Sequence, residues 1–524
     1  MSEQDGKHID KGSFPKLKTV IAVKRAALFD DNCFWRIDGT NTAAYLLPIR
    51  LTMIYLIASV LVYAFGPFEW TTYAPGLFYA LLVLYMVALW FGYRVGLMRK
   101  FSNAIEWKSG YTEKAMGVLS ILVVVNLAAY IVNIFREYGF TTFDFPGLLK
   151  QMSIGIRDPG LGYNLRLERI MYGQGGKILG GTLFTLFNYC WSFVRYPTMI
   201  FSMIYFKRMN IMGKIFAVIY LAVMVLFYLS IGTNIDVFHV FLLLEMKPLL
   251  DVFSSWHKKE ITKRKVLKLT ASILAGFLFI GCYFTWMMIS RGSINAYEEP
   301  EYNISGVQLS DKITGREPTV PPTEAPTVPP TEAPTVPPTE IPGDPSQEKP
   351  EDNKLAELFK KFWISFSAYF AQGYYGMTQG ITLPWTPMFG VGNSMFLVDF
   401  LSEHVYDIDQ FTYQMKIEQA YGWESDMRWH SMYTWLANDV SFYGVIVVMF
   451  LIGVLFAMMF KDAITTENPF SKASIFYFVL MVFFIPCNNQ IGQRSDTLLS
   501  FLLLVFCWLL TKHPPKFLKK WLSK

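Results

Sequence analysis

The run AMGVLSILVVVNLAAYIVNI at residues 115–134 is twenty residues long and contains no charged side chain. An α-helix rises 1.5 Å per residue, so a helix of this length spans about 30 Å, the thickness of the hydrocarbon core of a bilayer. The run therefore predicts a membrane-spanning helix.

The composition of the whole chain agrees with this prediction. Of 524 residues, 53% are hydrophobic and 17% are charged, whereas a soluble domain averages about 45–50% apolar and about 25% charged residues. Lipid is the solvent that such an apolar excess requires. The net charge of +6 does not indicate nucleic-acid binding, because most basic residues fall in short loops between apolar runs and there set the topology.

Further apolar runs of similar length occur along the chain. The predicted membrane-spanning helices are 43–65, 73–92, 115–134, 182–206, 214–231, 235–250, 267–289, 441–460, 474–490 and 496–511. The run at 235–250 is short and carries His239 and Glu245. The run at 182–206 contains Arg195 and Pro197, which indicates a kink.

The distribution of Lys and Arg orients these helices, because both residues favour the cytoplasmic side. With the basic N-terminal tail inside, the loops predicted to be cytoplasmic are rich in Lys and Arg. The short outer loops at 66–72 and 232–235 carry none, and the loop at 491–495 carries only Arg494. The predicted fold class is an all-α polytopic membrane protein with about ten transmembrane helices and both termini in the cytoplasm.

This topology divides the chain into segments. They are a cytoplasmic tail 1–42, seven helices in 43–289 with a basic outer loop 135–181, a large extracytoplasmic loop 290–440, three helices in 441–511, and a basic cytoplasmic tail 512–524. Within the large loop, an eight-residue unit, PTVPPTEA or PTVPPTEI, occurs three times at 318–341. Its proline content favours extended polyproline II and predicts a spacer. Residues 355–440 are rich in aromatic and polar residues, which predicts a folded cap or a re-entrant segment at the membrane surface.

The most distinctive polar pattern lies just before the run at 441–460. It begins Arg428-Trp-His430-Ser431 and continues to Asp439. An imidazole titrates near neutral pH, so His430 is a candidate general base, with Asp439 to orient it. The alternative is a solvated polar loop that contains a histidine.

The outer loop 135–181 is unusually basic. Arg157, Arg166 and Arg169 lie in it, and Arg291 follows the seventh predicted helix. Because a guanidinium can bond two phosphate oxygens at once, such a set suits a pyrophosphate headgroup. Alternatively, these arginines pair with acidic residues of the same loop or contact anionic lipid.

Several other chemistries find no support in the sequence. No GxGxxG or Walker A motif occurs at the start of a helix, and no Cys/His spacing resembles a zinc site. No periodic array of basic and aromatic residues suggests nucleic-acid binding. We therefore expect no cofactor, no metal and no nucleic-acid partner.

The layout and the residues around His430 together resemble the O-antigen and capsule repeat-unit polymerases (Wzy type), which are related to the O-antigen ligases. In those proteins the larger of two functional outer loops precedes the last few helices. His430, Ser431, Tyr433, Asp439 and Gly444 stand at steps matching the ligase pattern. Asp439 replaces the usual ligase Glu and Ser441 replaces the first Gly of a pair, and these departures favour the polymerases.

The resemblance implies a GT-C-like helical fold and a metal-independent, inverting glycosyl transfer on the outer face of a bacterial plasma membrane. The donor would be a growing glycan on polyprenyl pyrophosphate, and the acceptor a repeat unit on another such lipid. The product would be an O-antigen, a capsule or an exopolysaccharide. Besides these lipid-linked oligosaccharides and the bilayer, a chain-length regulator and a flippase are candidate partners.

The same resemblance assigns roles to the candidate residues. The arginines would hold pyrophosphate, His430 or less readily Asp439 would accept the proton of the acceptor hydroxyl, and the tyrosines would stack on sugars. The catalytic candidates are His430, Asp439 and Arg428, and the substrate-binding candidates are Arg157, Arg166, Arg169, Arg291, Tyr374 and Tyr375.

Three other functions stay open. A ligase would transfer finished glycan to a different acceptor. A flippase for lipid-linked oligosaccharide would have short loops on both sides, so the long segment 290–440 argues against it. A membrane acyltransferase would carry an intramembrane histidine, for which His239 is the candidate.

Overall fold

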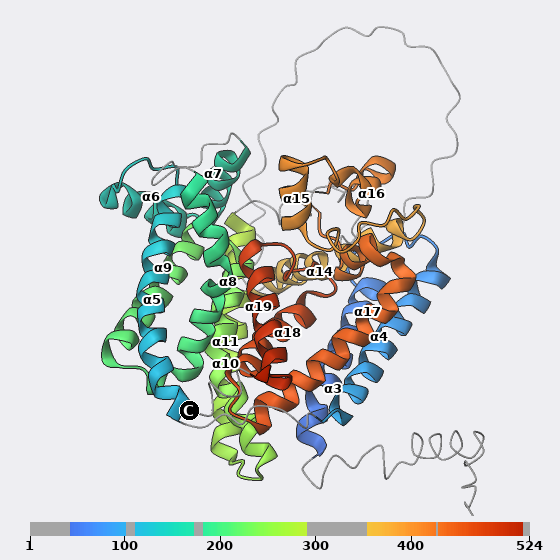
Figure 1. The fold of residues 1–524 in the computed structure, drawn as a ribbon. Helices are drawn as coiled ribbons and strands as arrows, with labels where there is room; N and C mark the ends of the chain where they lie inside the picture. Colours follow the sequence, from blue (N-terminus) through green and yellow to red (C-terminus); the bar gives the residue numbers. More distant parts are fainter. Residues whose placement is uncertain (1–41, 101–109, 172–181, 291–353, 426–427, 517–524) are drawn as a thin grey trace, which may run out of the picture.

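A computed structural model describes residues 42–100, 110–171, 182–290, 354–425 and 428–516, and these form helices and no β-strand (Figure 1). The first half of the chain contains α3 (Thr42–Phe65), α4 (Pro75–Met98), α5 (Gly110–Glu137), α6 (Phe145–Arg157), α7 (Pro159–Met171), α8 (Thr182–Tyr205), η1 (Phe206–Arg208), α9 (Ile211–Ser230), α10 (Asn234–His257) and α11 (Lys263–Ser290). The second half contains α14 (Lys354–Gly380), α15 (Met395–His404), η3 (Asp409–Phe411), α16 (Tyr413–Tyr421), α17 (Met432–Thr465), α18 (Pro469–Phe484) and α19 (Ser495–Lys512).

A helix lies at every one of the ten predicted ranges. Within the described part of the chain, seven helices are long and apolar enough to cross a membrane: α3, α4, α5, α9, α11, α17 and α19. The other three predicted spans fall on α8, α10 and α18. Helix α18 has only 16 residues, whereas α8 and α10 are long but carry polar side chains that face the protein interior, including buried His239.

Short helices lie at one end of the helical bundle, and a helix–helix turn lies at the other. Figure 1 shows α6, α7, α15 and α16 together at one end, which we call the cap end. The turn between α10 and α11 lies at the opposite end, as do the first residues of α3 and the last residues of α19. The described parts of the two long loops of the sequence analysis thus contribute to the same end.

Helices α4 and α17 form the most extensive helix pair. Gly92 and Gly96 of α4 lie against the backbone at Phe450 and Val454, and a Cβ atom at either glycine would come within 2.4 Å of a carbonyl oxygen of α17. Glycine allows two backbones to approach this closely, which stabilises helix pairs where lipid supplies no hydrophobic driving force. The two helices are therefore in direct backbone contact over more than one turn.

Helix α17 differs from its prediction at its start. It begins at Met432, nine residues before the predicted span at 441–460. Ser441 has φ 61° and ψ 165°, so the first two turns are separated from the long apolar part by a kink. The hydroxyl of Ser441 faces the N–H of Gly444 at 3.5 Å, where the apolar part of the helix starts again.

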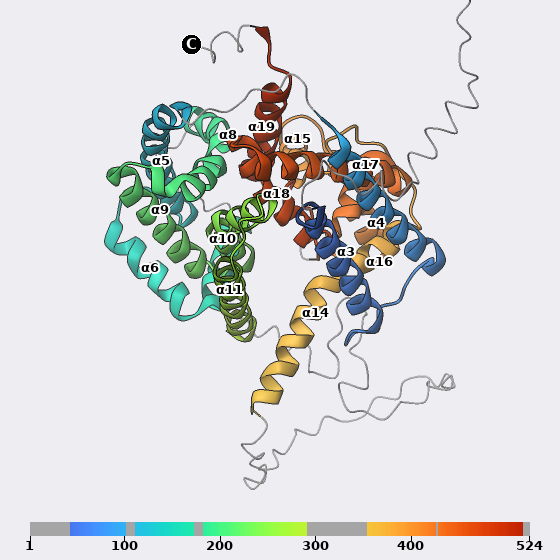
Figure 2. The ribbon, with the colours of Figure 1, turned by 90° about the horizontal axis from the view of Figure 1, so that it is seen from below.

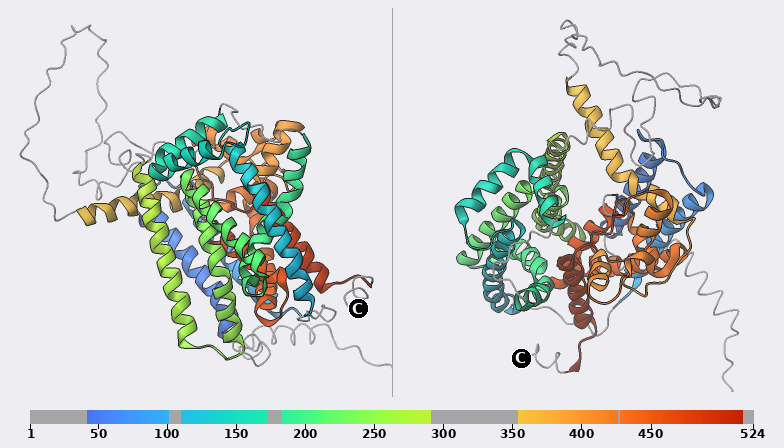
Figure 3. Two further views of the ribbon diagram at one scale, coloured as in Figure 1. Left: turned by 90° about the vertical axis from the view of Figure 1, so that its left-hand side faces the viewer. Right: turned by 90° about the horizontal axis from the view of Figure 1, so that it is seen from above.

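Helix α14 falls in the segment that was predicted to be a cap or a re-entrant segment. It runs across the direction of the spanning helices and projects beyond the bundle, as Figures 2 and 3 show. Its projecting half exposes Phe359 and Trp363, although Phe362 beside them packs against Phe284 of α11. The helix also packs against α3 and α16. Helix α14 therefore lies at the cap end as a transverse element.

Candidate functional site

The loop that carries His430 is held by backbone hydrogen bonds from two sides. The N–H of Ser431 donates to the carbonyl of Gly373 on α14 at 3.1 Å, and the N–H of Met432 donates to the carbonyl of Ile485, just past α18, at 3.0 Å. The hydroxyl of Ser431 then accepts from the N–H of Thr434 at 3.3 Å and caps α17. These contacts fix the position of His430 relative to α14, α17 and α18.

The imidazole of His430 lies against a glycine of α14. A Cβ atom at Gly376 would lie 2.8 Å from Nδ1 of His430, so any larger residue there would displace the ring. His430 is only 1% exposed, and neither ring nitrogen has a hydrogen-bond partner. Desolvation lowers the pKa of His430 to about 3, against the opposing effect of the Glu418 carboxylate. The imidazole is therefore neutral in this state.

Aromatic side chains gather at the same turn of α14. The Tyr375 ring lies 4.9 Å from the Trp423 ring and 5.3 Å from the Trp70 ring, measured between centroids. Trp423 also contacts Gly376 beside His430, and the indole nitrogens of Trp70 and Trp423 are buried without a partner. Since buried polar atoms are rarely left unpaired, these unpaired donors and acceptors make this part of the protein the candidate ligand site.

Arg428 adds a positive charge to the same grouping. Its guanidinium lies over the Trp423 ring at 5.5 Å, and its Nε atom is 3.7 Å from the Glu424 carboxylate. That separation is too long for a hydrogen bond, and Nε is buried without a partner. We call Trp70, Tyr375, Trp423, Arg428 and His430 the imidazole–aromatic cluster. It joins the segment after α3 to α14 and to the loop before α17.

Asp439 occupies a different position and has a clear structural role. Its carboxylate accepts from the backbone N–H groups of Gly390, Gly392 and Asn393 at 2.8–3.0 Å, and from Nδ2 of Asn393 at 2.7 Å. The neighbouring Asn438 bonds the carbonyl of Gly392 and the N–H of Tyr413. Asp439 therefore anchors the segment before α15, and among the described residues its carboxylate makes no hydrogen bond with His430.

The two candidate tyrosines, Tyr374 and Tyr375, lie in different surroundings. Tyr375 belongs to the imidazole–aromatic cluster. Tyr374, one residue earlier, is 1% exposed and hydrogen-bonds with the hydroxyl of Ser59 on α3 at 2.9 Å. Its ring packs against Tyr63 and Phe78. Sugar stacking on these two residues stays a prediction, and Tyr375 is the better placed of the pair.

The arginines of the outer loop lie on α6 and α7, which pack with α9 and, for α7, with α11. Arg157 is exposed at the end of α6. Arg166 donates to the Glu137 carboxylate at 2.7 Å, and the Arg169 guanidinium lies over the Tyr138 ring at 4.9 Å. Partial burial lowers the pKa of Arg169 from its usual value. Arg291 lies outside the described residues.

Sequence reasoning missed the partners of Arg195. Its Nη1 atom lies 3.3 Å from the Asp496 carboxylate, which Arg494 also contacts at 3.1 Å. Arg494 in turn bonds Asp236 at 2.9 Å. This network of two arginines and two aspartates joins α8, α10 and α19. One feature of the sequence could have indicated this network: Arg494 is the only basic residue in the predicted outer loop 491–495.

Within the described residues, no group of three or more His, Cys, Asp or Glu side chains could hold a metal ion. Comparison with protein-family models, with curated proteins and with solved structures found no match for the chain. The helices alone define its class, which is that of a polytopic helical membrane protein.

Proposed function

We propose that this chain is a glycosyltransferase that polymerises polyprenyl-pyrophosphate-linked oligosaccharide repeat units at the cap end. The observation that carries the proposal is the imidazole–aromatic cluster. A neutral histidine with two unpaired ring nitrogens is buried against Gly376 of α14, where the bundle meets its cap. The neighbouring Tyr375 packs against the Trp70 and Trp423 rings, and the Arg428 guanidinium lies over Trp423. Such a site combines a proton acceptor, flat aromatic faces and a positive charge.

The low pKa of His430 constrains this role. A base with a pKa of about 3 is a weak proton acceptor at neutral pH, since general bases work best near the operating pH. A pyrophosphate close to the ring would favour the imidazolium and raise the pKa. In this proposal, binding of the lipid-linked donor therefore turns His430 into an effective base. Arg428, and Arg157 at the end of α6, would hold the anionic groups.

The backbone at Ser441 gives the resemblance further support. Its φ and ψ fall in a region that is essentially restricted to glycine. The related ligases carry a glycine at this step of the pattern. The residue differs, but the backbone conformation is one that a glycine would adopt without strain.

The proposal is tested by mass spectrometry of lipid-linked glycans in cells that lack the chain, complemented with wild type, His430→Gln or the control His404→Gln. His404 is an exposed histidine at the end of α15. We expect single repeat units to accumulate, without polymer, in the deletion and the His430→Gln cells only. Full polymer with His430→Gln would remove His430 as the base. Accumulation of long lipid-linked polymer in the deletion would identify a ligase instead.

The network of Arg195, Asp496, Arg494 and Asp236, in which both carboxylates are buried, favours a second candidate function, transport of the lipid-linked oligosaccharide. Arg195 lies within the predicted span 182–206, and charged residues within a membrane often mark a transport path. The same experiment separates the two functions, because loss of a transporter would leave repeat units on the cytoplasmic leaflet, where added periplasmic glycosidases cannot reach them.

A further inference from the structure

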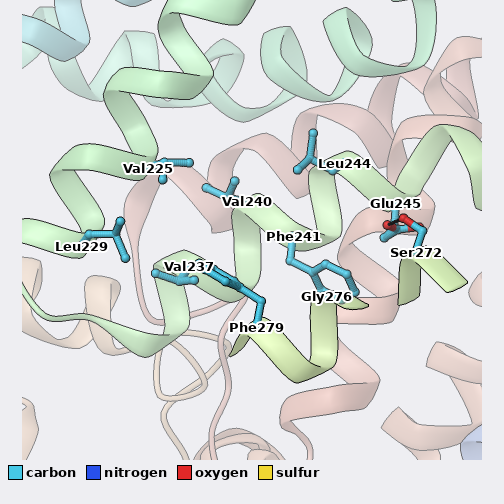
Figure 4. Close-up of a pocket in the computed structure, with 10 residues that line it drawn as sticks. All are labelled: Val225, Leu229, Val237, Val240, Phe241, Leu244, Glu245, Ser272, Gly276 and Phe279. Carbon is cyan, nitrogen blue, oxygen red and sulfur yellow. Dashed lines mark hydrogen bonds between the residues drawn. The ribbon is translucent and has the colours of Figure 1, made fainter. Parts of the chain in front are cut away.

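A pocket of about 310 Å³ lies between α9, α10 and α11, far from the imidazole–aromatic cluster in the chain (Figure 4). Its walls are apolar along most of their length and include Val225 and Leu229 of α9 and Val240 of α10. Its size is at the lower end of the range for ligand pockets, about 300–1,000 Å³. Leu244 and Phe279 line it and are also exposed on the outer surface of the bundle, so the pocket opens sideways toward lipid.

One end of this pocket is polar. Glu245 is 8% exposed, and one of its carboxylate oxygens accepts a hydrogen bond from the hydroxyl of Ser272 on α11. The other oxygen, Oε2, is buried and has no partner. A buried carboxylate oxygen without a donor is costly, so a ligand that brings a donor to Oε2 would gain a hydrogen bond that the protein alone leaves unmade.

A positive charge lies beyond this polar end. Lys268 is exposed and stands one turn before Ser272 on the same face of α11, about 6 Å along the axis. The turn between α10 and α11 is also basic, with Lys258, Lys259 and Lys263. Along one face, the site therefore presents a cation, then a hydrogen-bond acceptor, then an apolar groove.

The wall of the groove is shaped by Gly276. A Cβ atom there would come within 2.0 Å of the Phe241 ring, so the ring lies flat against the α11 backbone only because this residue is glycine. Figure 4 shows Phe241 and Gly276 between the Glu245 end and the apolar end. This close contact leaves the groove open over the ring.

We propose that this groove binds a single-chain phospholipid with a free hydroxyl, of the lysophospholipid class, from the leaflet at the α10–α11 turn. In such a molecule the hydroxyl lies between the phosphate and the hydrocarbon chain. The phosphate meets Lys268, the hydroxyl donates to Oε2 of Glu245, and the chain lies along Val240, Val225 and Leu229. The order of groups in the ligand matches the order of groups along the groove.

The test is native mass spectrometry of the full-length protein in detergent with 1-palmitoyl-lysophosphatidylglycerol as the probe. We expect a saturable adduct with the wild type, weakened on the order of tenfold by Glu245→Leu, which removes the acceptor. Val225→Trp should abolish the adduct by filling the groove. Val218→Trp, an equally large change on an exposed part of the same helix, should leave it intact, as should Glu260→Leu in the exposed turn.

A second probe keeps the proposal testable if the Glu245→Leu protein fails to fold. The 2-deoxy analogue of the same lipid lacks the hydroxyl, and we expect it to bind the wild type on the order of tenfold more weakly. Equal binding of the two probes would overturn the proposal. So would complete displacement of the probe by an equal concentration of diacyl phosphatidylglycerol, since the groove would then be an ordinary lipid contact.

Discussion

The carboxylate of Asp439 holds Asn393 twice, through the backbone N–H at 3.0 Å and through Nδ2 at 2.7 Å. With two further N–H donors on the same carboxylate, this contact fastens the segment before α15 to the kinked start of α17. Asp439 therefore has a structural role in the cap, which is to hold the segment before α15 in place.

Replacing Asp439 with alanine should destabilise the cap. The change leaves four donors without their acceptor. Each hydrogen bond to a charged group contributes about 1.5–3 kcal/mol to the free energy of unfolding. We expect a lower thermal unfolding midpoint in detergent and faster proteolysis near residues 386–394. Asp407→Ala, at an exposed position of the same cap, serves as the control. An unchanged midpoint for Asp439→Ala would contradict the anchoring role.

The burial of His430 predicts a dependence of stability on pH. Its folded pKa of about 3 lies below the ordinary value of 6.5, so the unfolded chain binds a proton that the folded chain does not. Burial of the neutral imidazole therefore lowers the free energy of unfolding only at acidic pH. The stability is complete above pH 6.5 and falls by about 1.4 kcal/mol per pH unit as the pH decreases toward 3. His430→Gln should show a shallower loss of thermal stability between pH 7 and pH 4. His404→Gln should follow the wild type, and parallel curves for all three proteins would show that His430 is not buried as described.

Ser441 predicts a gain of stability on substitution. Its φ of 61° with ψ near 165° costs a residue with a Cβ atom about 1–3 kcal/mol. Ser441→Gly should remove most of this strain, with only the weak contact to the Gly444 N–H lost, and should raise the unfolding midpoint. Ser441→Val should lower it, because a β-branched residue is disfavoured at positive φ. A lower midpoint for Ser441→Gly would mean that the hydroxyl contributes more than the strain.

The charge network joining α8 and α19 predicts a large effect of removing one partner. Asp496→Ala leaves Arg195 and Arg494 without their shared carboxylate, and breaking a buried ion pair costs about 3–5 kcal/mol. Glu357→Ala breaks the exposed pair with Lys361 on α14, for which about 0–1 kcal/mol is expected. Chemical unfolding in a mild detergent compares the two. Equal, small effects would show that solvent or lipid headgroups screen the network.

Much of the fold was predictable because membrane-spanning helices are long, apolar and separated by charged loops. The run 115–134 lies inside α5, and the described parts of the two long loops lie at one end of the bundle. Helix α14 was harder to predict as one helix, because its Gly373, Gly376 and aromatic residues have weak intrinsic helix propensity. Its contacts with α3, α16 and the loop before α17 stabilise it, and such contacts leave no local signal in the sequence.

The candidate site was predictable only in part. The sequence singled out His430 and Arg428, which lie together, and Tyr375, which lies beside them. Trp70 was missed because it is distant from His430 in the sequence, and Trp423 because it belongs to no motif. Only folding brings their rings to Tyr375. The predicted pairing of His430 with Asp439 did not anticipate that the carboxylate is occupied by the backbone at Gly390, Gly392 and Asn393.

Helix α14 has one further consequence. It is a single continuous helix from Lys354 to Gly380, whose outer half projects beside the bundle while Gly373 and Gly376 support the His430 loop. A stiff rod supported in this way is a lever. A force on the exposed Phe359 and Trp363 would therefore be transmitted along the helix to the Gly376 surface that seals the imidazole.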